Sequence, residues 1–191
     1  MILLKKKLIS IVGVVLIFLL IFAAAFLFLR EEEKTLPIKY EQEVFESASA
    51  YDVPPELVFS IIYAESTFRD QVVSKHGAMG LMQLMPETYE ELAGKLGIDT
   101  ATASPFDPQV NIKCGTYYLH ELYQMFGRWE LVIIAYNAGL GNVRTWLADS
   151  RYADGQGGLA VVPYSETATY LRRVQSAMPT YRDMIQKQTT D

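Results

Sequence analysis

Apolar and polar positions follow a helical period along most of the chain after residue 40. Prolines or acidic residues stand before several of these segments and glycines follow others, as is typical of helix starts and ends. Strand patterns are few, so the sequence predicts a mainly α domain. The expected helices span 40–51, 52–66, 86–97, 107–127, 129–139, 141–149 and 165–186, the last of them bent near Pro179.

Two stretches between these helices have no clean period. Residues 74–85, "SKHGAMGLMQLM", contain two glycines and are predicted to form a structured loop or a tight hairpin. Residues 151–165 are predicted to form a glycine-rich loop. Met79 and Met85 are expected to fill the core.

A different pattern precedes residue 31. Residues 8–29 form a run of 22 whose only clearly polar member is Ser10, and a helix of that length spans about 33 Å, enough for a bilayer core of about 30 Å. A secretory signal peptide has an apolar core of about 7–15 residues followed by a cleavage site, whereas "FLFL" continues the run after "AAA" here. An uncleaved single-pass anchor in the cell membrane is therefore favoured over a cleaved signal. The "KKK" at 5–7 should stay in the cytoplasm, which places the rest of the chain on the extracytoplasmic side.

The chain thus divides into an anchor at 1–30, a linker at 31–39 and one domain at 40–191. The anchor holds 4 of the 17 basic residues and none of the 22 acidic ones, which leaves a net charge of −9 beyond it. Such an acidic domain is a poor partner for nucleic acid. The single Cys114 allows no intramolecular disulfide and is expected to be a buried packing residue. No cluster of metal ligands is evident, so no metal or cofactor is expected.

Glu65 is an unexpected residue in the second helix. Val58, Ile61, Ile62 and Glu65 share one face, so the carboxyl group extends an apolar stripe. It also lies in the last turn, near the negative end of the helix dipole. Desolvation and the dipole should both raise its pKa, which suits a general acid that protonates a glycosidic oxygen. The alternative is a core-edge glutamate paired with a Lys or Arg.

Glycoside hydrolysis usually needs a second carboxyl group. Glu56 lies nine residues before Glu65 and faces away from it, Asp52 belongs to the helix start, and Asp70 lies past the helix end. No other Asp or Glu stands in a comparable motif. A mechanism with one carboxylate, in which the substrate supplies the nucleophile, is therefore a candidate.

Five short motifs follow one another along the chain: "ES-x-F" at 65–68, "GLMQLMP" at 80–86, "NI-x-x-G-x-x-YL" at 111–119, "AYNAG" at 135–139 and "PYSETATYLRRV" at 163–174. In order and spacing they resemble the soluble lytic transglycosylases, over residues 40–185. The resemblance implies an α+β lysozyme-like fold similar to goose-type lysozyme, with one compact helical domain.

The resemblance implies a single catalytic acid and base, Glu65. The substrate-binding residues that it implies are Ser66, Gly80, Met82, Gln83, Tyr136, Asn137 and Tyr170. The Tyr170 hydroxyl is expected near the catalytic carboxyl group. Glu166 and Thr167 match the glutamate–threonine pair that precedes this tyrosine in the family. This chain departs from the family at Ala168, where a basic or polar residue is usual.

Several of these residues have a structural alternative. Gln83 needs a hydrogen-bond partner, which is either the backbone or a sugar acetamido group. Asn137 can cap its helix, and Tyr136 can be a packed ring with a satisfied hydroxyl.

The resemblance implies a peptidoglycan lytic transglycosylase. Such an enzyme cleaves the β-1,4 bond between N-acetylmuramic acid and N-acetylglucosamine and leaves a 1,6-anhydromuramic end. Two alternatives stay open: a water-using muramidase of the same fold, and a non-catalytic wall-binding module, against which the presence of Glu65 argues. The expected partners are glycan strands and the membrane, and the sequence indicates no particular protein partner.

Overall fold

A computed structural model describes Phe22 and residues 36–188. The chain from Leu36 onward forms one compact unit. The predicted membrane helix at 8–29 lies, apart from Phe22, outside the described residues, as does most of the predicted linker at 31–39, so both stay predictions. None of the helices in the described part is long and apolar enough to cross a membrane.

The described part of the domain is mainly helical, as predicted. Its helices are α2 (Glu41–Tyr51), α3 (Pro55–Glu65), α4 (Pro86–Lys95), α5 (Pro108–Phe126), α6 (Trp129–Ala138), α7 (Leu140–Leu147) and α8 (Ser165–Gln188). Helix α8 continues through Pro179 as one element. Within residues 36–188 the β part of the expected fold is limited to isolated bridges, of Val73 with Met79, Met79 with Leu84 and Ala153 with Leu159.

Prolines mark where three helices begin. Pro55, Pro86 and Pro108 lie in the first turn of α3, α4 and α5, where a missing N–H leaves no helical hydrogen bond unmade. Asp107 also caps α5, because its carboxylate accepts from the Gln109 N–H at 2.9 Å. Such signals are local in the sequence, which explains why the predicted bounds lie within a few residues of the observed ones.

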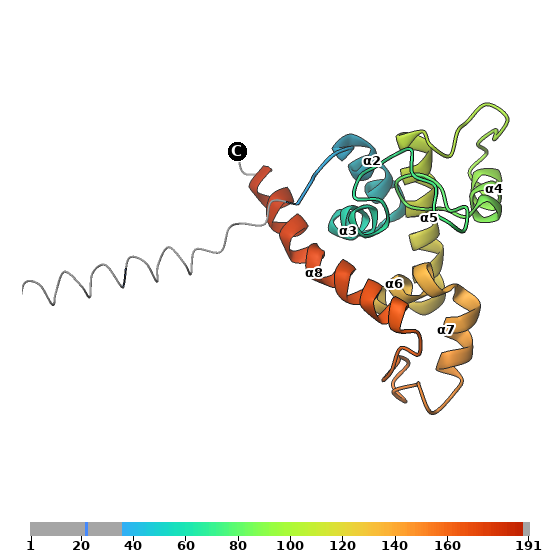
Figure 1. The fold of residues 1–191 in the computed structure, drawn as a ribbon, viewed down its shortest axis with the longest axis vertical. Helices are drawn as coiled ribbons and strands as arrows, with labels where there is room; N and C mark the ends of the chain where they lie inside the picture. Colours follow the sequence, from blue (N-terminus) through green and yellow to red (C-terminus); the bar gives the residue numbers. More distant parts are fainter. Residues whose placement is uncertain (1–21, 23–35, 189–191) are drawn as a thin grey trace, which may run out of the picture. The chain divides into compact units, whose positions relative to one another are not determined.

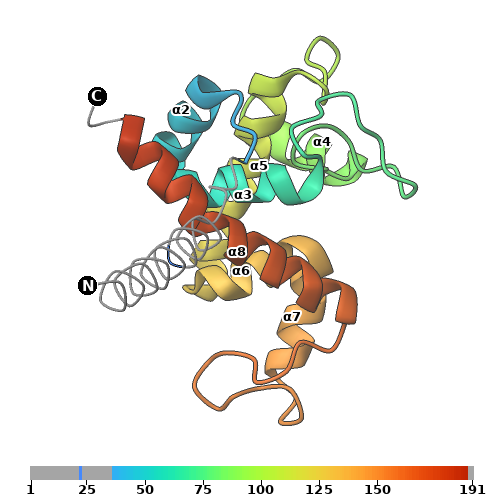
Figure 2. The same cartoon turned by 60° about the vertical axis from the view of Figure 1, so that its left-hand side comes forward.

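Helix α3 forms the centre of the core. It packs against α2 and α8, and α6 packs against α5, α7 and α8. Figures 1 and 2 show α8 crossing both α3 and α6. The buried residues of α3 lie on every side of the helix, and they are Leu57, Val58, Phe59, Ser60, Ile61, Ile62 and Ala64. The face shared by Val58, Ile61, Ile62 and Glu65 is therefore only part of the buried surface of α3, because the rings of Phe45 and Tyr181 cover Phe59 outside it.

A second, smaller core lies between α4 and α5, and Cys114 is part of it. Cys114 is confirmed as a buried packing residue, and burial raises the pKa of its thiol to about 11, which leaves it unreactive. Met79 packs against this core as predicted. The prediction for Met85 was wrong, because its side chain is 43% exposed. It stands at the N-cap of α4, before the part of the helix that packs begins.

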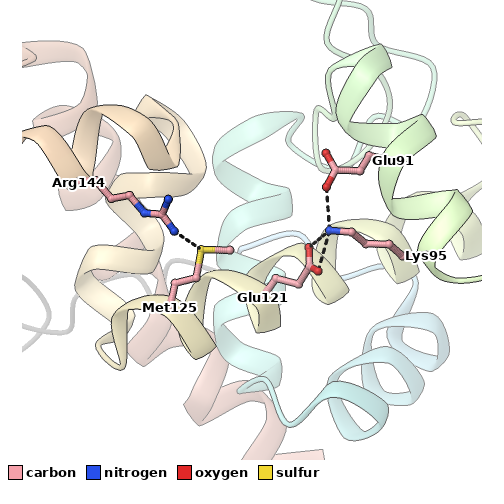
Figure 3. Close-up of polar contacts among 5 residues, drawn as sticks. All are labelled: Glu91, Lys95, Glu121, Met125 and Arg144. Atoms are coloured by element: carbon pink, nitrogen blue, oxygen red, sulfur yellow. Dashed lines mark hydrogen bonds and ion pairs between the residues drawn. The ribbon is translucent and has the colours of Figure 1, made fainter.

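Polar contacts join the outer surfaces of these helices (Figure 3). Lys95 on α4 lies 2.8 Å from a carboxylate oxygen of Glu91 and 2.8 Å from one of Glu121 on α5. Arg144 on α7 donates to the sulfur of Met125 on α5 at 3.6 Å. These groups are partly exposed, and such pairs contribute little to stability.

The predicted glycine-rich loop lies between α7 and α8, at the α7 end of the domain in both views (Figures 1 and 2). Asp154 organises it, because its carboxylate accepts from the backbone N–H of Gln156 at 2.7 Å and of Gly158 at 2.8 Å. Arg128, just before α6, lies 3.8 Å from the same carboxylate. The Arg128 contact thereby attaches the loop next to the N-terminal end of α6.

Candidate active site

Glu65 is the last residue of α3, and its side chain is only partly exposed. Burial raises the pKa of its carboxyl group from 4.5 to about 7, although the Tyr170 hydroxyl and the Arg173 charge act in the opposite direction. The raised pKa predicted from the sequence is confirmed. A carboxyl group that titrates near neutral pH can both give and accept a proton.

Two residues of α8 influence Glu65 from far along the chain. The Tyr170 hydroxyl is buried and finds no hydrogen bond of good geometry among the described residues, yet it is close enough to lower the pKa of Glu65. Arg173 also lowers it, and the Arg173 guanidinium donates to the Tyr63 carbonyl at 3.2 Å. Glu65 itself makes no ion pair with a described residue, so the alternative of a paired core-edge glutamate is not supported.

No second carboxylate of the described residues is among the groups that shift the pKa of Glu65. The groups that shift its pKa are a phenol and a guanidinium. Glu56 lies at the other end of α3 and pairs with Arg182 at 3.0 Å. The arrangement therefore favours one carboxyl group that acts twice, rather than an acid and a separate nucleophile.

Ser66 follows Glu65 at the C-cap of α3 and is 1% exposed. Its hydroxyl donates to the Ile62 carbonyl at 3.2 Å, and its backbone N–H bonds to the same carbonyl at 3.0 Å. Both bonds close the last turn of the helix. The predicted contact of Ser66 with substrate stays a prediction, and in this structure the hydroxyl serves the backbone.

The second motif forms a tight turn, as predicted. Met79 and Leu84 exchange backbone hydrogen bonds of 2.9 and 3.0 Å across it. Gly80 is buried within the turn, and Met82 is fully buried. Gly80 has no side chain and the Met82 side chain reaches no surface, so their predicted contact with substrate also stays a prediction.

Gln83 lies in the same turn and is partly exposed. Its amide nitrogen donates to the Gly80 carbonyl at 2.8 Å and to the Val72 carbonyl at 3.2 Å. Of the two alternatives for its partner, the backbone is therefore the one observed. Both amide hydrogens are used in this way, which leaves the amide oxygen as the group available to a ligand.

Tyr136 and Asn137 lie near the end of α6. The Tyr136 hydroxyl donates to the Met82 carbonyl at 2.8 Å, so this ring is packed with its hydroxyl satisfied. Burial, followed by the charge of Glu65, raises the pKa of Tyr136 well above its usual range, which places the phenol near the candidate acid. Asn137 does not cap the helix, because Gly139 occupies the C-cap position. Its side chain instead lines a pocket of about 470 Å³.

Sequence reasoning missed two residues of this region. Tyr164 lines the same pocket as Asn137, is half exposed, and sets its ring edge-on to Trp146 at 4.9 Å. Asn111 on α5 is fully buried and bonds to the turn around Met82. Tyr164 and Asn111 each lie within one of the five sequence motifs. Asn111 could also have been found because it is a polar residue on the packed face of its helix.

A larger hollow of about 610 Å³ lies at the other end of α3, next to Asp52 and Pro55. None of the residues predicted for the site lines it. Glu65 follows Pro55 by ten residues, which is about 15 Å along the helix. The candidate active site is therefore placed at Glu65. No group of residues in the described part could hold a metal ion.

Comparisons with known proteins bear directly on this site. The family described as "Transglycosylase SLT domain" matches residues 42–156, more than half of the chain. The chain belongs to this family. The matched region holds Glu65, the turn around Met82, and both Tyr136 and Asn137, while Tyr170 lies beyond it.

Curated relatives of this SLT domain include the soluble lytic murein transglycosylase of Escherichia coli strain K12. It is 34% identical over 154 residues, which cover 78% of this chain and 24% of that protein. The membrane-bound lytic murein transglycosylase C of Yersinia pestis (strain Pestoides F) is 33% identical over 168 residues, 75% of this chain and 47% of that protein. The chain thus spans about a quarter to a half of the length of these relatives.

Solved structures agree with the helical architecture. An inactive glutamate-to-glutamine variant of the lytic transglycosylase Slt from Pseudomonas aeruginosa matches with a TM-score of 0.72 and 34% identity, over 79% of this chain and 25% of that one. The 70 kDa soluble lytic transglycosylase from Escherichia coli matches with a TM-score of 0.70 and 35% identity, over 78% of this chain and 25% of that one. The mainly helical fold expected from the sequence agrees with these neighbours.

Proposed function

We propose that this SLT domain is a peptidoglycan lytic transglycosylase, with Glu65 as its only catalytic carboxyl group. The observation that carries the proposal is the environment of Glu65, where burial brings the pKa to about 7 and no carboxylate of the described residues contributes to that shift. Membership of the family and the names of the relatives support the same activity.

In the first step, Glu65 protonates the oxygen that bridges N-acetylmuramic acid to N-acetylglucosamine. The bond between that oxygen and the muramic C1 breaks, and the 2-acetamido group stabilises the positive charge that develops on C1. Such substrate assistance replaces the missing second carboxylate. A largely protonated Glu65 favours this step, because the acid must hold its proton until the bond breaks.

In the second step, the ionised Glu65 removes the proton from the muramic 6-hydroxyl, and that oxygen bonds to C1. The product is a 1,6-anhydro end, Glu65 regains its proton, and no water is consumed. Tyr170 lies close enough to stabilise the carboxylate between the two steps. We assign Gln83 and Asn137 to contacts with the sugar amides, Tyr136 and Met82 to the wall behind them, and Ser66 and Gly80 to the supporting backbone.

The test is mass spectrometry of the glycan products that purified protein releases from cell wall. A lytic transglycosylase releases products lighter by the mass of one water than those of a muramidase, with no oxygen taken from labelled water. Reducing muramic ends that contain the labelled oxygen would assign the domain to the hydrolases instead. Glu65→Gln should lower the rate at least about 10³-fold, since one residue serves both steps. A fully active Glu65→Gln protein would refute both enzyme assignments.

We also propose that residues 8–29 anchor the domain on the extracytoplasmic side of the cell membrane. The apolar run and the preceding "KKK" support this, and one relative is a membrane-bound enzyme. Protease added to spheroplasts should then degrade the domain. Protection of the whole chain would refute the orientation, and a mature protein that begins near Phe26 would show a cleaved signal.

A further inference from the structure

Asn111 is a buried polar residue for which the proposed chemistry has no role. It lies in the first turn of α5 with none of its surface exposed. Its Oδ1 accepts from the Met82 N–H at 2.8 Å, and its Nδ2 donates to the carbonyls of Pro105 at 2.7 Å and Met79 at 3.1 Å. One side chain therefore holds the turn around Met82 and the segment before α5 at the same time.

Two glycines allow this close approach. A Cβ at Gly80 would lie 2.6 Å from the Pro105 carbonyl and would overlap the Asn111 amide, and Gly80 has a φ of +75°. A Cβ at Gly115, one turn after Asn111 on the same face of α5, would lie 2.8 Å from the Met82 methyl group. Both positions require glycine because the turn sits directly on α5.

Tyr136 holds the same residue from the other side. Its hydroxyl donates to the Met82 carbonyl at 2.8 Å, so the N–H of Met82 is bound from α5 and its C=O from α6. The next residue, Gln83, has a φ of 51°, a backbone conformation that residues other than glycine rarely adopt. Fixing the peptide groups on both sides of Met82 therefore fixes the direction in which Gln83 leaves the turn.

We propose that Asn111 is a positioning residue, which together with Tyr136 clamps the peptide groups of Met82 and thereby sets the wall of the cleft beside Glu65. The inference rests on the proposed function for its link to catalysis. The clamp acts through the backbone of the turn, and its effect on substrate is exerted by Gln83, whose amide oxygen stays available to a ligand.

The test uses Asn111→Leu, Asn111→Asp and Tyr136→Phe in the full chain. Asn111→Leu keeps the size of the side chain and removes all three hydrogen bonds, whereas Asn111→Asp keeps the acceptor for the Met82 N–H but sets an oxygen against the carbonyls of Pro105 and Met79. The matched control is Tyr181→Phe in the C-terminal half of α8. This variant also removes a hydrogen bond of 2.8 Å from a buried tyrosine, here to the Pro37 carbonyl.

The first measurement is hydrogen exchange of the peptide that spans 79–85. Exchange should accelerate at least about tenfold in Asn111→Leu, Asn111→Asp and Tyr136→Phe, with no change in Tyr181→Phe. The second measurement is kcat/KM on purified glycan strands, together with strand affinity in the inactive Glu65→Gln background. Both quantities should fall at least about tenfold in Asn111→Leu and Tyr136→Phe, and less than twofold in Tyr181→Phe.

A folded Asn111→Leu protein that shows faster exchange but the kcat/KM and affinity of the control would make Asn111 merely structural and would overturn the proposal. If Asn111→Leu does not fold, Tyr136→Phe decides, because a loss below twofold there overturns the clamp equally. If wild-type protein cleaves no glycan, the proposed function has failed, and exchange and strand affinity still decide whether the clamp shapes a binding cleft.

Discussion

The stability of the domain should depend on pH through Glu65, and Glu65→Gln should remove that dependence. The carboxyl group lies at the end of a helix that is buried on all sides, and burial is the main cause of its raised pKa. Glutamine has nearly the same shape and stays uncharged at every pH. The comparison therefore isolates the ionisation of one buried group.

The sign follows from proton binding. Between its unfolded pKa near 4.5 and its folded pKa of about 7, Glu65 binds its proton more tightly in the folded protein than in the unfolded chain. The free energy of unfolding therefore falls as pH rises through this window, and the penalty is complete above about pH 7. The difference of about 2.5 pKa units corresponds to an upper limit of roughly 3 kcal/mol at about 1.36 kcal/mol per unit. Because the side chain is partly exposed, we expect about 1–3 kcal/mol.

Urea unfolding followed by circular dichroism between pH 4 and pH 8.5 measures this quantity. Wild type and Glu65→Gln should be about equally stable near pH 4, and the variant should become the more stable protein by about 1–3 kcal/mol at pH 8. Glu90→Gln, which changes an exposed carboxyl group on α4, should give a difference from wild type that varies much less with pH. A flat difference between wild type and Glu65→Gln, or a wild type more stable at pH 8, would refute the burial argument.

Three further variants test other parts of the structure. Tyr170→Phe should raise the pKa of Glu65 further and shift the alkaline limb of the pH–rate profile upward. Stability should change little near pH 4, where Glu65 is protonated and the hydroxyl has no good partner among the described residues, and should fall at pH 8, where the carboxylate loses a stabilising neighbour; a downward shift of the limb would contradict this. Cys114→Ala should keep activity within about twofold, and the native thiol should resist a thiol reagent until the protein unfolds, since it is buried with a raised pKa. Lys95→Gln should cost less than about 1 kcal/mol in urea unfolding, and high salt should abolish most of the difference, because its ion pairs are partly exposed.

The helices could be predicted because their signals lie close together in the sequence. Pro55, Pro86 and Pro108 begin helices in the structure, and Asp107 caps the third of them. The face that Glu65 extends is only part of the buried surface of α3, and which other sides of a helix are covered depends on elements far along the chain. Tyr181 covers Phe59, and the two are separated by more than a hundred residues in the sequence.

The candidate acid and the Tyr170 hydroxyl near it could be predicted, whereas the packing of the turn around Met82 could not. Glu65 interrupts an apolar pattern, and that is visible in one short stretch. Met82 matched a motif whose residues were expected to line a cleft, yet it is buried, because Gly115 leaves space for it on α5. The close approach between this turn and α5 depends on two glycines, Gly80 and Gly115. No periodic pattern in the sequence indicates which helix a turn will contact.

The position of Glu65 links the stability of the domain to its proposed chemistry. A carboxyl group with an ordinary pKa would be ionised at neutral pH and could not protonate the bridging oxygen before the bond breaks. Burial at the end of α3 raises the pKa to about 7, while Tyr170 and Arg173 keep it from rising further. A much higher pKa would make the residue a good acid and leave too little carboxylate for the second step. The opposing effects of burial and of α8 therefore suit one residue that must act first as an acid and then as a base, and the cost is a folded state that loses stability as Glu65 ionises.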